Sequence, residues 1–577
     1  MADSAISPFK FDFVVATTFA SINQAFKEYL RRLPKSEPIS VCVIASNPQN
    51  QTEISFETLK KNTGVDPFSI PDGTEWGKSP DLQTLSKANF FFGMRGQLAA
   101  GAADFKGDVP MALLSIARST DNASRVQFAP VWKTFDVVSL YKNTTTGNWE
   151  WSHLSKPSKP NVDWVVGIDV PFARDSRLGY ERWKQDTMNA RTTALMDKFG
   201  AKYGWGNVRV HRLLVDMANA DVDNLLVNQA STWAGLPGLV FVAFKQWVRA
   251  LMQKVDANLF VLGFMVTVPP VVSNPNDPGA FIIAGPVRLS SFNVRVQPRQ
   301  SDALNQIATI DYQCVANDLP QPAPQRITWD WVPDIKTSQS HHGIVSVSRQ
   351  TMAYYLHKQL DAFATAQSLQ PNVYIAVNGY EYTLSLSPGQ SPANEERPTT
   401  GTTLLRYTSD REGYDSGGLA DNVTLRVKSH YVLSADFDAS NLVLTQTRTL
   451  WIDAEDWDSS RKGYIFARSR KDTYSFVVDA DTGGVVHEPA VVETFSAGAE
   501  PARGNQDHFE ETSDLNNGLD TLVAQAGLRD PAGMDEFDVD FLDGLAFPGM
   551  NEFKFVKPGF VVSGDFVAGV NYPAPEK

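Results

Sequence analysis

The hydrophobic positions of this chain follow a repeated arrangement, in which short amphipathic helices stand singly among long β-rich stretches. The first helix begins after Thr17 or Thr18, either of which can cap it, and ends at Pro34. Its apolar residues recur every three or four positions and therefore share one face of the helix. These residues are Phe19, Ile22, Phe26, Tyr29, Leu30 and Leu33.

Two further segments show the same helical periodicity. One starts at Pro237, a residue favoured in the first turn of a helix, and the other follows Ser348, which can act as its cap. The apolar face of the first comprises Val240, Ala243, Phe244, Trp247 and Leu251. The apolar face of the second comprises Met352, Tyr355, Leu356, Leu360 and Phe363.

Most other apolar runs have the period or the length of strands. Residues 208–217 alternate, and residues 259–268 are almost wholly apolar, as in a strand buried on both faces. Long β-type runs also occupy 373–386, 423–437 and 442–453. Each single helix must lay its apolar face on a curved sheet. We therefore predict an α+β fold dominated by antiparallel sheet.

The length of the chain predicts more than one hydrophobic core. A chain of 577 residues exceeds what one core usually supports. The proline-rich segment 320–324 suggests a boundary, so we predict two elongated modules, residues 1–320 and 321–577. The extended, proline-containing stretch 156–161 marks a sub-boundary within the first module.

The charge of the chain argues against nucleic acid as a partner. The net charge is −13, whereas nucleic-acid binding needs a basic face. Between residues 500 and 543, twelve acidic residues stand against two arginines. Such a run is typical of a solvated surface or a loop, and less often of a partner or calcium site. Within it, the alternating acidic and apolar residues 535–543 predict an edge strand protected by charge.

The two cysteines and the N-terminus bear on the cellular compartment. Cys42 and Cys314 lie in apolar, strand-like contexts, which predicts buried free thiols and excludes a disulfide scaffold. The first 25 residues lack a signal-peptide pattern, and the longest apolar segment, 259–270, is about half a membrane span. We expect a soluble protein without a transmembrane segment, cytoplasmic as synthesised, and non-classical release remains open.

No pattern in the chain favours catalysis, a metal or a cofactor. The string Gly413–Gly418 resembles a protease nucleophile loop, but Tyr414 replaces the small residue that an oxyanion hole needs, so we interpret it as a surface turn. Residues Asp479–Gly484 lack the distal glutamate of a calcium loop and are better explained as a hairpin turn. His341, His342 and His357 lack the converging spacing of zinc ligands. We expect no enzyme, no metal and no cofactor.

Three short segments resemble a known family. The segment Phe11–Thr17, followed by Ile22-Asn23-Gln24, resembles the start of the accessory proteins encoded beside clostridial neurotoxins. Ile327–Val332 and Phe547–Phe553 are similar to bacterial and fungal proteins of unknown function in the same group. This group belongs to the tubular lipid-binding (TULIP) superfamily. The resemblance implies modules in which a highly curved antiparallel sheet wraps around an amphipathic helix. It brings no catalytic residues.

The resemblance implies that the first helix lines a pocket, through Phe19, Ile22, Phe26 and Leu30. The apolar faces of the other two helices add candidate lining residues. These are Val240, Phe244, Trp247, Met352, Leu356 and Phe363. The resulting hypothesis is a non-enzymatic binder of lipid or another elongated apolar ligand, accessory to a toxin or a secretion system. The alternative left open is a structural or protein-interaction module with filled cores that acts through its surface, since apolar helix faces usually belong to cores.

Overall fold

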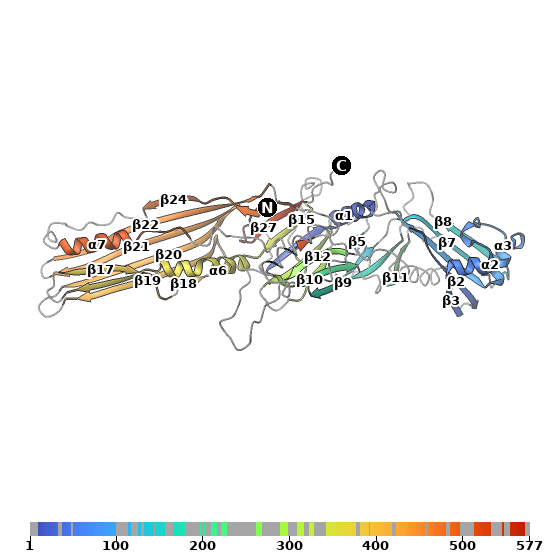
Figure 1. The fold of residues 1–577 in the computed structure, drawn as a ribbon, viewed down its shortest axis with the longest axis horizontal. Helices are drawn as coiled ribbons and strands as arrows, with labels where there is room; N and C mark the ends of the chain where they lie inside the picture. Colours follow the sequence, from blue (N-terminus) through green and yellow to red (C-terminus); the bar gives the residue numbers. More distant parts are fainter. Residues whose placement is uncertain are drawn as a thin grey trace.

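The computed structural model describes the larger part of the chain. The described residues are 10–32, 37–47, 50–99, 114–116, 125–128, 132–143, 145–155, 166–178, 197, 201, 209–215, 221–227, 261–267, 289–297, 308–316, 322–327, 342–376, 381–391, 393–417, 423–456, 459–480, 485–496, 513–531, 545–546 and 554–571. They form an elongated, sheet-rich molecule with few helices (Figure 1). All strand pairs among them are antiparallel. The predicted dominance of antiparallel sheet is therefore confirmed.

A six-stranded sheet at the middle of the molecule joins distant parts of the chain (Figure 1). In spatial order its strands are β13 (Leu289–Gln297), β14 (Thr309–Ala316), β1 (Phe13–Thr18), β15 (Gly343–Val347), β27 (Phe566–Asn571) and β26 (Lys554–Phe560). Strands from both sides of residue 320 thus share one sheet. The division into modules 1–320 and 321–577 stays a prediction.

A strand followed directly by a helix occurs twice in and beside this central sheet. β1 leads into α1 (Phe19–Arg32), and β15 leads into α6 (Arg349–Gln367). The two helix starts are capped in the same way. The Thr18 hydroxyl accepts a hydrogen bond from Ser21 N at 3.2 Å, and the Ser348 hydroxyl accepts one from Thr351 N at 3.2 Å. The repeated helical pattern in the sequence therefore corresponds to a repeated structural unit.

The two copies of this unit meet symmetrically. β1 and β15 are antiparallel neighbours, and their register is centred on the pair of Val15 with Val345, which hold the same place in the two copies. The register also pairs Phe13 with Val347 and Thr17 with Gly343. Because the strands point in opposite directions, α1 and α6 lie on opposite sides of the central sheet along the long axis (Figure 1).

Backbone hydrogen bonds tie each helix start to the residue that precedes the other unit. Thr18 N donates to His342 O at 3.1 Å, and Ser348 N donates to Asp12 O at 2.7 Å. Asp12 Oδ1 also accepts from the Thr351 hydroxyl at 2.8 Å. These hydrogen bonds fix both helices relative to the central sheet.

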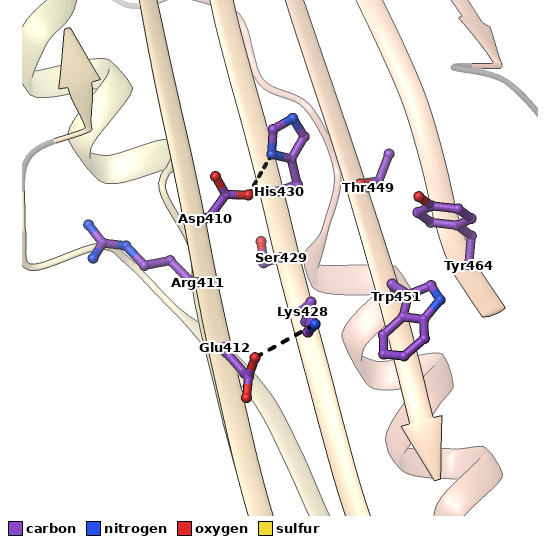
Figure 2. A pocket seen from close by; sticks show the side chains of 9 residues that line it. All are labelled: Asp410, Arg411, Glu412, Lys428, Ser429, His430, Thr449, Trp451 and Tyr464. Carbon is purple, nitrogen blue, oxygen red and sulfur yellow. Dashed lines mark hydrogen bonds and ion pairs between the residues drawn. The ribbon is translucent and has the colours of Figure 1, made fainter. Parts of the chain in front are cut away.

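A seven-stranded sheet of long strands forms one end of the molecule (Figure 1). Its strands are β18 (Asn394–Glu396), β19 (Thr403–Ser416), β20 (Thr424–Asp438), β21 (Asn441–Asp456), β22 (Ser459–Val478), β23 (Val485–His487) and β24 (Val491–Ser496), with β23 and β24 both paired to β22. Its inner face contacts α6, α7 (Ser513–Gln525) and the hairpin of β16 (Gln370–Ile375) and β17 (Tyr382–Ser387). The strict alternation of burial along β20 leaves the outer face to solvent, and Figure 2 shows polar side chains on it.

Helix α7 lies within the acidic segment 500–543, where the sequence analysis expected a solvated surface or a loop. Leu515, Leu519 and Leu522 are 1%, 5% and 0% exposed and pack on the inner face of the large sheet. These leucines are spaced as on one face of a helix. The prediction for this segment did not use this signal because it considered only the number of acidic residues. The expectation of a loop is wrong for residues 513–525, which form a helix with one buried face, whereas Asp520 on its other side is exposed to solvent. The predicted edge strand at 535–543 lies outside the described residues.

A five-stranded sheet forms the other end of the molecule (Figure 1). In spatial order its strands are β3 (Asn50–Ile54), β2 (Ile39–Asn47), β4 (Phe90–Leu98), β7 (Trp132–Lys142) and β8 (Trp149–Ser155). Two short helices, α2 (Phe56–Thr63) and α3 (Pro80–Lys87), begin at the caps Ser55 and Ser79. Leu59, Leu82 and Leu85 share a separate buried cluster with strand residues. One face of this sheet therefore has a core of its own, whereas residues of the other face, such as Val41 and Met94, belong to the larger cluster of the molecule.

His153 on β8 joins this sheet to the turn around residue 70, and we expect the joint to weaken as pH rises. Nδ1 lies 2.6 Å from Ile70 O, and Nε2 lies 3.4 Å from Asp136 Oδ1. The hydrogen bond with Asp136 raises the pKa of His153. Burial of the Asp136 carboxyl works to raise its pKa, but the hydrogen bonds from His153 and Ser155 outweigh burial and lower it. The contribution of protonated His153 to stability is therefore fully present below about pH 6.5, the pKa of an unfolded histidine. It is lost as the pH rises through the raised pKa of His153 in the folded protein.

The matching measurement is hydrogen exchange of residues 66–72 between about pH 6 and about pH 8.5, corrected for intrinsic exchange. Protection should fall with rising pH in the parent protein and should be low and nearly constant in His153→Gln. The contribution of ionised Asp136 to stability is present above about pH 3.8 and therefore does not change between about pH 6 and about pH 8.5. His430→Gln, an exposed histidine of the large sheet, should behave as the parent. An equal pH dependence in His153→Gln would contradict the assignment.

A further seven-stranded sheet lies between the central sheet and the five-stranded end (Figure 1). Its strands are β25 (Leu545–Ala546), β12 (Val261–Thr267), β10 (Arg209–Val215), β9 (Val166–Leu178), β6 (Arg125–Phe128) and β5 (Leu114–Ile116), with β11 (Asp221–Val227) also paired to β9. The predicted helix after Pro237 and the connector 156–161 lie outside the described residues. Among the described helices, none combines the length and apolarity that crossing a bilayer requires.

One local prediction in the large sheet needs correction. The protease-like string at 413–418 is not a surface turn as far as it is described, because β19 continues to Ser416. A Cβ on Gly413 would lie 2.5 Å from Pro371 O, so this glycine allows the β16 strand to approach β19 closely. The predicted β-type run 373–386 contains the two strands β16 and β17, which form a separate two-stranded sheet.

Candidate functional site

The apolar face of α6 lies on the inner face of β19 and β20. Met352 and Leu356, two predicted lining residues, are 1% and 0% exposed there. Phe363, predicted with them, is half-buried and packs against the same cluster of side chains. The cap at Ser348 fixes where the helix begins and thus which residues meet the strands.

The apolar face of α1 is buried in the equivalent way. Phe19, Ile22 and Leu30 are at most 4% exposed, and α1 contacts β1 and β5. Phe26 belongs to the helix, but its side chain lies outside what the structure describes. In the alignment of the two units given by their caps, Ile22 corresponds to Met352, and Leu30 corresponds to Leu360.

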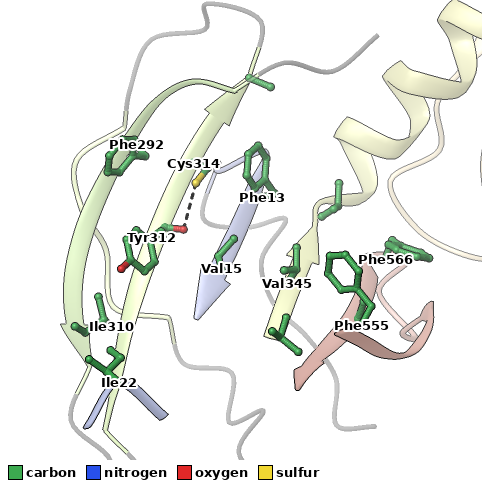
Figure 3. Close-up of a cluster of buried hydrophobic side chains, with 14 of the residues drawn as sticks. Phe13, Val15, Ile22, Phe292, Ile310, Tyr312, Cys314, Val345, Phe555 and Phe566 are labelled. Atoms are coloured by element: carbon green, nitrogen blue, oxygen red, sulfur yellow. Dashed lines mark hydrogen bonds between the residues drawn. The ribbon is translucent and has the colours of Figure 1, made fainter. Parts of the chain in front are cut away.

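One cluster of buried apolar residues contains the side chains of both helices and of the central sheet. Figure 3 shows its middle part, where residues from five chain segments converge. The residues labelled there are Phe13, Val15, Ile22, Phe292, Ile310, Tyr312, Cys314, Val345, Phe555 and Phe566. The described lining residues predicted on the first and third helices thus belong to or pack against one continuous cluster, on opposite sides of the central sheet. Those predicted on the second, Val240, Phe244 and Trp247, lie outside the described residues.

Buried tyrosines stand at the border of this apolar interior, and the sequence analysis missed them. The Tyr407 hydroxyl lies 2.9 Å from His357 Nδ1, and the Tyr431 hydroxyl donates to Gln446 Oε1 at 3.1 Å. Burial raises the pKa of both phenols, so each remains a neutral hydrogen-bonding group. His357 also lies 3.1 Å from Glu395 Oε2, which gives this end of the interior a polar edge.

Arg448 on β21 is a buried cation, 0% exposed, at the place where two helices end. Its guanidinium donates to Gln367 O at 2.6 Å, at the end of α6, and to Ala526 O at 2.8 Å and Gly527 O at 3.1 Å, just after α7. Burial lowers the pKa of Arg448 to about 10, which leaves it charged at neutral pH. Its charge complements the negative ends of both helix dipoles.

Arg349, the first residue of α6, organises the other end of that helix. Its guanidinium donates to carbonyls of the 398–403 segment and of the turn at Ser563, among them Gly401 O at 2.7 Å and Pro398 O at 2.9 Å. Its backbone N–H donates to Asp565 Oδ1 at 2.8 Å. Arg349 corresponds to Phe19 of the first unit, so the first unit has no guanidinium at the equivalent position.

The remaining acidic, histidine and thiol side chains of the described part of the chain do not meet the spatial requirements of a metal site. No three His, Cys, Asp or Glu side chains gather there in a way that could hold a metal ion. Cys42 and Cys314 are buried free thiols, as predicted, and burial raises the pKa of Cys42 to about 12. β22, which ends at Val478, pairs in antiparallel orientation with β23, which begins at Val485, and most of the predicted hairpin turn between them lies outside the described residues.

No protein-family model matches the sequence, and no curated protein is significantly similar to it. Among solved structures, a lipopolysaccharide binding protein is similar with a TM-score of 0.27 and 10% sequence identity, over 98% of this chain and 99% of that chain. At these values the similarity establishes neither a common fold nor a common ligand.

Proposed function

We propose that this protein is a non-enzymatic binder of lipid or another elongated apolar molecule. The observation that carries the proposal is the duplicated strand–helix unit, which places two amphipathic helices on antiparallel sheets on either side of the central sheet. An elongated apolar ligand would lie along the apolar face of one or both helices. The family resemblance adds a role as an accessory factor to a toxin or a secretion system.

Ligand entry requires the helix to move away from the sheet. Ile22 and Met352 are 4% and 1% exposed in the present conformation, so the space between helix and sheet is occupied by side chains. Burial of an acyl chain contributes about 0.8 kcal/mol for each CH₂ group, which can offset the free energy of separating the helix from the strands. The proposal therefore includes an opening of α1 or α6 that the ligand stabilises.

The direct test is native mass spectrometry of the purified protein, followed by organic extraction and lipid analysis. We expect a co-purified lipid at fixed stoichiometry, or its uptake after incubation with mixed phospholipid vesicles. A ligand-free mass that is unchanged after this incubation would contradict the proposal. It would favour the alternative of a protein-interaction module.

A pair of tryptophan variants on α6 locates the ligand. Met352→Trp enlarges a residue of the apolar face and should lower the lipid stoichiometry by filling its space, whereas Lys358→Trp on the exposed side of the same helix should not. The unfolding midpoint serves as the control for folding. If Met352→Trp lowers stability by about 1–3 kcal/mol without changing lipid content, the site is a packed core and the ligand lies elsewhere.

One observation favours the alternative of a module that acts through its surface. Every residue of β24 is exposed, and Val491, Val492 and Phe495 are among the most exposed large apolar residues that the structure describes, at 63%, 48% and 48%. An exposed strand with apolar side chains is a recognised docking surface for other chains. The lipid test above decides between the two functions.

A further inference from the structure

We propose that the outer face of the large sheet carries a binding site for a neutral sugar ring. A cleft of about 570 Å³ lies there, formed by four adjacent strands, β19 to β22 (Figure 2). Its size falls in the range of about 300–1,000 Å³ that is usual for small-molecule sites. It lies on the face opposite α6 and α7, so this proposal does not depend on the apolar interior.

The strand register arranges the cleft side chains in two rows that cross the sheet. One row consists of Asp410, His430 and Thr449. The other consists of Glu412, Lys428, Trp451 and Tyr464. Because directly opposed residues on neighbouring strands have Cβ atoms about 5 Å apart, each row presents a continuous set of groups to a ligand lying across it.

The aromatic end of the second row supplies a flat apolar surface. Trp451 and Tyr464 are directly opposed across β21 and β22, next to the bulge between Leu450 and Trp451. Tyr464 is 44% exposed, and Trp451 is half-buried with Lys428 Nζ 5.3 Å from its ring. One face of a pyranose ring consists of C–H groups, which pack against such aromatic side chains while the hydroxyls point outward.

The rest of the cleft supplies hydrogen-bonding groups of both kinds. Asp410 Oδ1 lies 2.7 Å from His430 Nδ1, and Glu412 lies 3.3 Å from Arg426 and 4.0 Å from Lys428. These contacts leave carboxylate lone pairs and ammonium N–H groups available to a ligand. Sugar hydroxyls, which both donate and accept, match this mixture of donors and acceptors.

The charge of the cleft selects against an ionic ligand. Glu412 lies near the cations Arg426 and Lys428, and Asp410 contacts His430, so the charges of the cleft are largely compensated. A phosphate or sulfate would need an excess of donors, and a cation would need an excess of carboxylates. The arrangement therefore points to an uncharged polyol with an apolar ring face, such as a neutral hexopyranose unit of a glycan.

The test uses saturation-transfer NMR and calorimetry on the full chain with maltohexaose, cellohexaose and chitohexaose. At least one should bind, and Trp451→Ala should weaken its affinity about tenfold or more, because the stacking surface is lost. Glu412→Gln should weaken it as well. Tyr374→Ala removes an aromatic residue that is 56% exposed on β16, outside the cleft, and should leave the affinity unchanged.

Three results would overturn the proposal. If no saturation is transferred from the protein to any of the three sugars at millimolar concentration, the proposed site does not bind a neutral sugar. An unchanged affinity in Trp451→Ala would place the sugar elsewhere. Preferential, salt-sensitive binding of a sulfated heparin fragment would show an anion site instead. Unfolding midpoints confirm that the variants fold, and Tyr464→Ala replaces Trp451→Ala if that variant does not. Because none of these sugars is apolar, failure here leaves the lipid proposal untouched.

Discussion

Replacing Arg448 by methionine is expected to destabilise the large sheet and its two helices by about 3–4 kcal/mol. Methionine fills much of the space but leaves the carbonyls of Gln367, Ala526 and Gly527 buried without their donor. The cost of burying the guanidinium, visible in its lowered pKa, offsets part of its contribution and limits the loss to this range. The effect should be largest at the C-terminal turns of α6 and α7.

The suitable measurement is hydrogen exchange of peptides that cover residues 360–368 and 519–527, because a chain with several cores need not unfold in one step. Arg448→Lys should give an intermediate loss, since lysine keeps the charge but cannot reach both helix ends with a planar fork. Arg468→Met, at an exposed position of β22, should change exchange little. Unchanged protection of both peptides in Arg448→Met would show that the helix ends do not depend on this residue.

Replacing Arg349 by methionine is expected to cost about 3 kcal/mol and to release the 398–403 segment from the start of α6. Five carbonyl oxygens in two distant segments accept hydrogen bonds from its guanidinium. Gly564 has a φ of +85°, and a Cβ there would lie 2.7 Å from Arg349 Nη1, so the neighbouring turn is shaped around the arginine. The backbone bond of Arg349 to Asp565 remains in the variant.

Limited proteolysis and hydrogen exchange of residues 396–404 would measure this release. Arg397→Met, a matched substitution in the same segment at a side chain that is 40% exposed, should leave both nearly unchanged. If Arg349→Met and Arg397→Met change proteolysis and exchange equally, the position of the 398–403 segment does not depend specifically on Arg349.

Local interactions explain why the helices could be predicted. The stripe on α6, its start after Ser348 and the stripe on α1 depend on residues within a few positions of one another, and the observed bounds agree with the prediction. The same local signal was present for α7, at Leu515, Leu519 and Leu522, but the prediction gave more weight to the surrounding charge.

Long-range pairing explains what the sequence did not reveal. Val15 meets Val345 across the central sheet, and neither strand carries a local mark of its partner. Arg448 resembles any other strand arginine in the sequence, yet its acceptors lie about 80 residues away on both sides. The outer cleft likewise exists only because the register of four strands places Trp451, Tyr464 and Glu412 in one row.

The sequence by itself determined the helices α1 and α6, their caps, the buried free cysteines and the predominance of antiparallel sheet, because periodicity and capping act over a few residues. Only the tertiary structure decided which strands pair, that the two strand–helix units meet symmetrically, and which polar residues become buried caps or cleft walls. The physical reason is that strand register, helix-end capping at a distance and cleft formation depend on groups brought together by the whole sheet. No short stretch of sequence encodes those contacts.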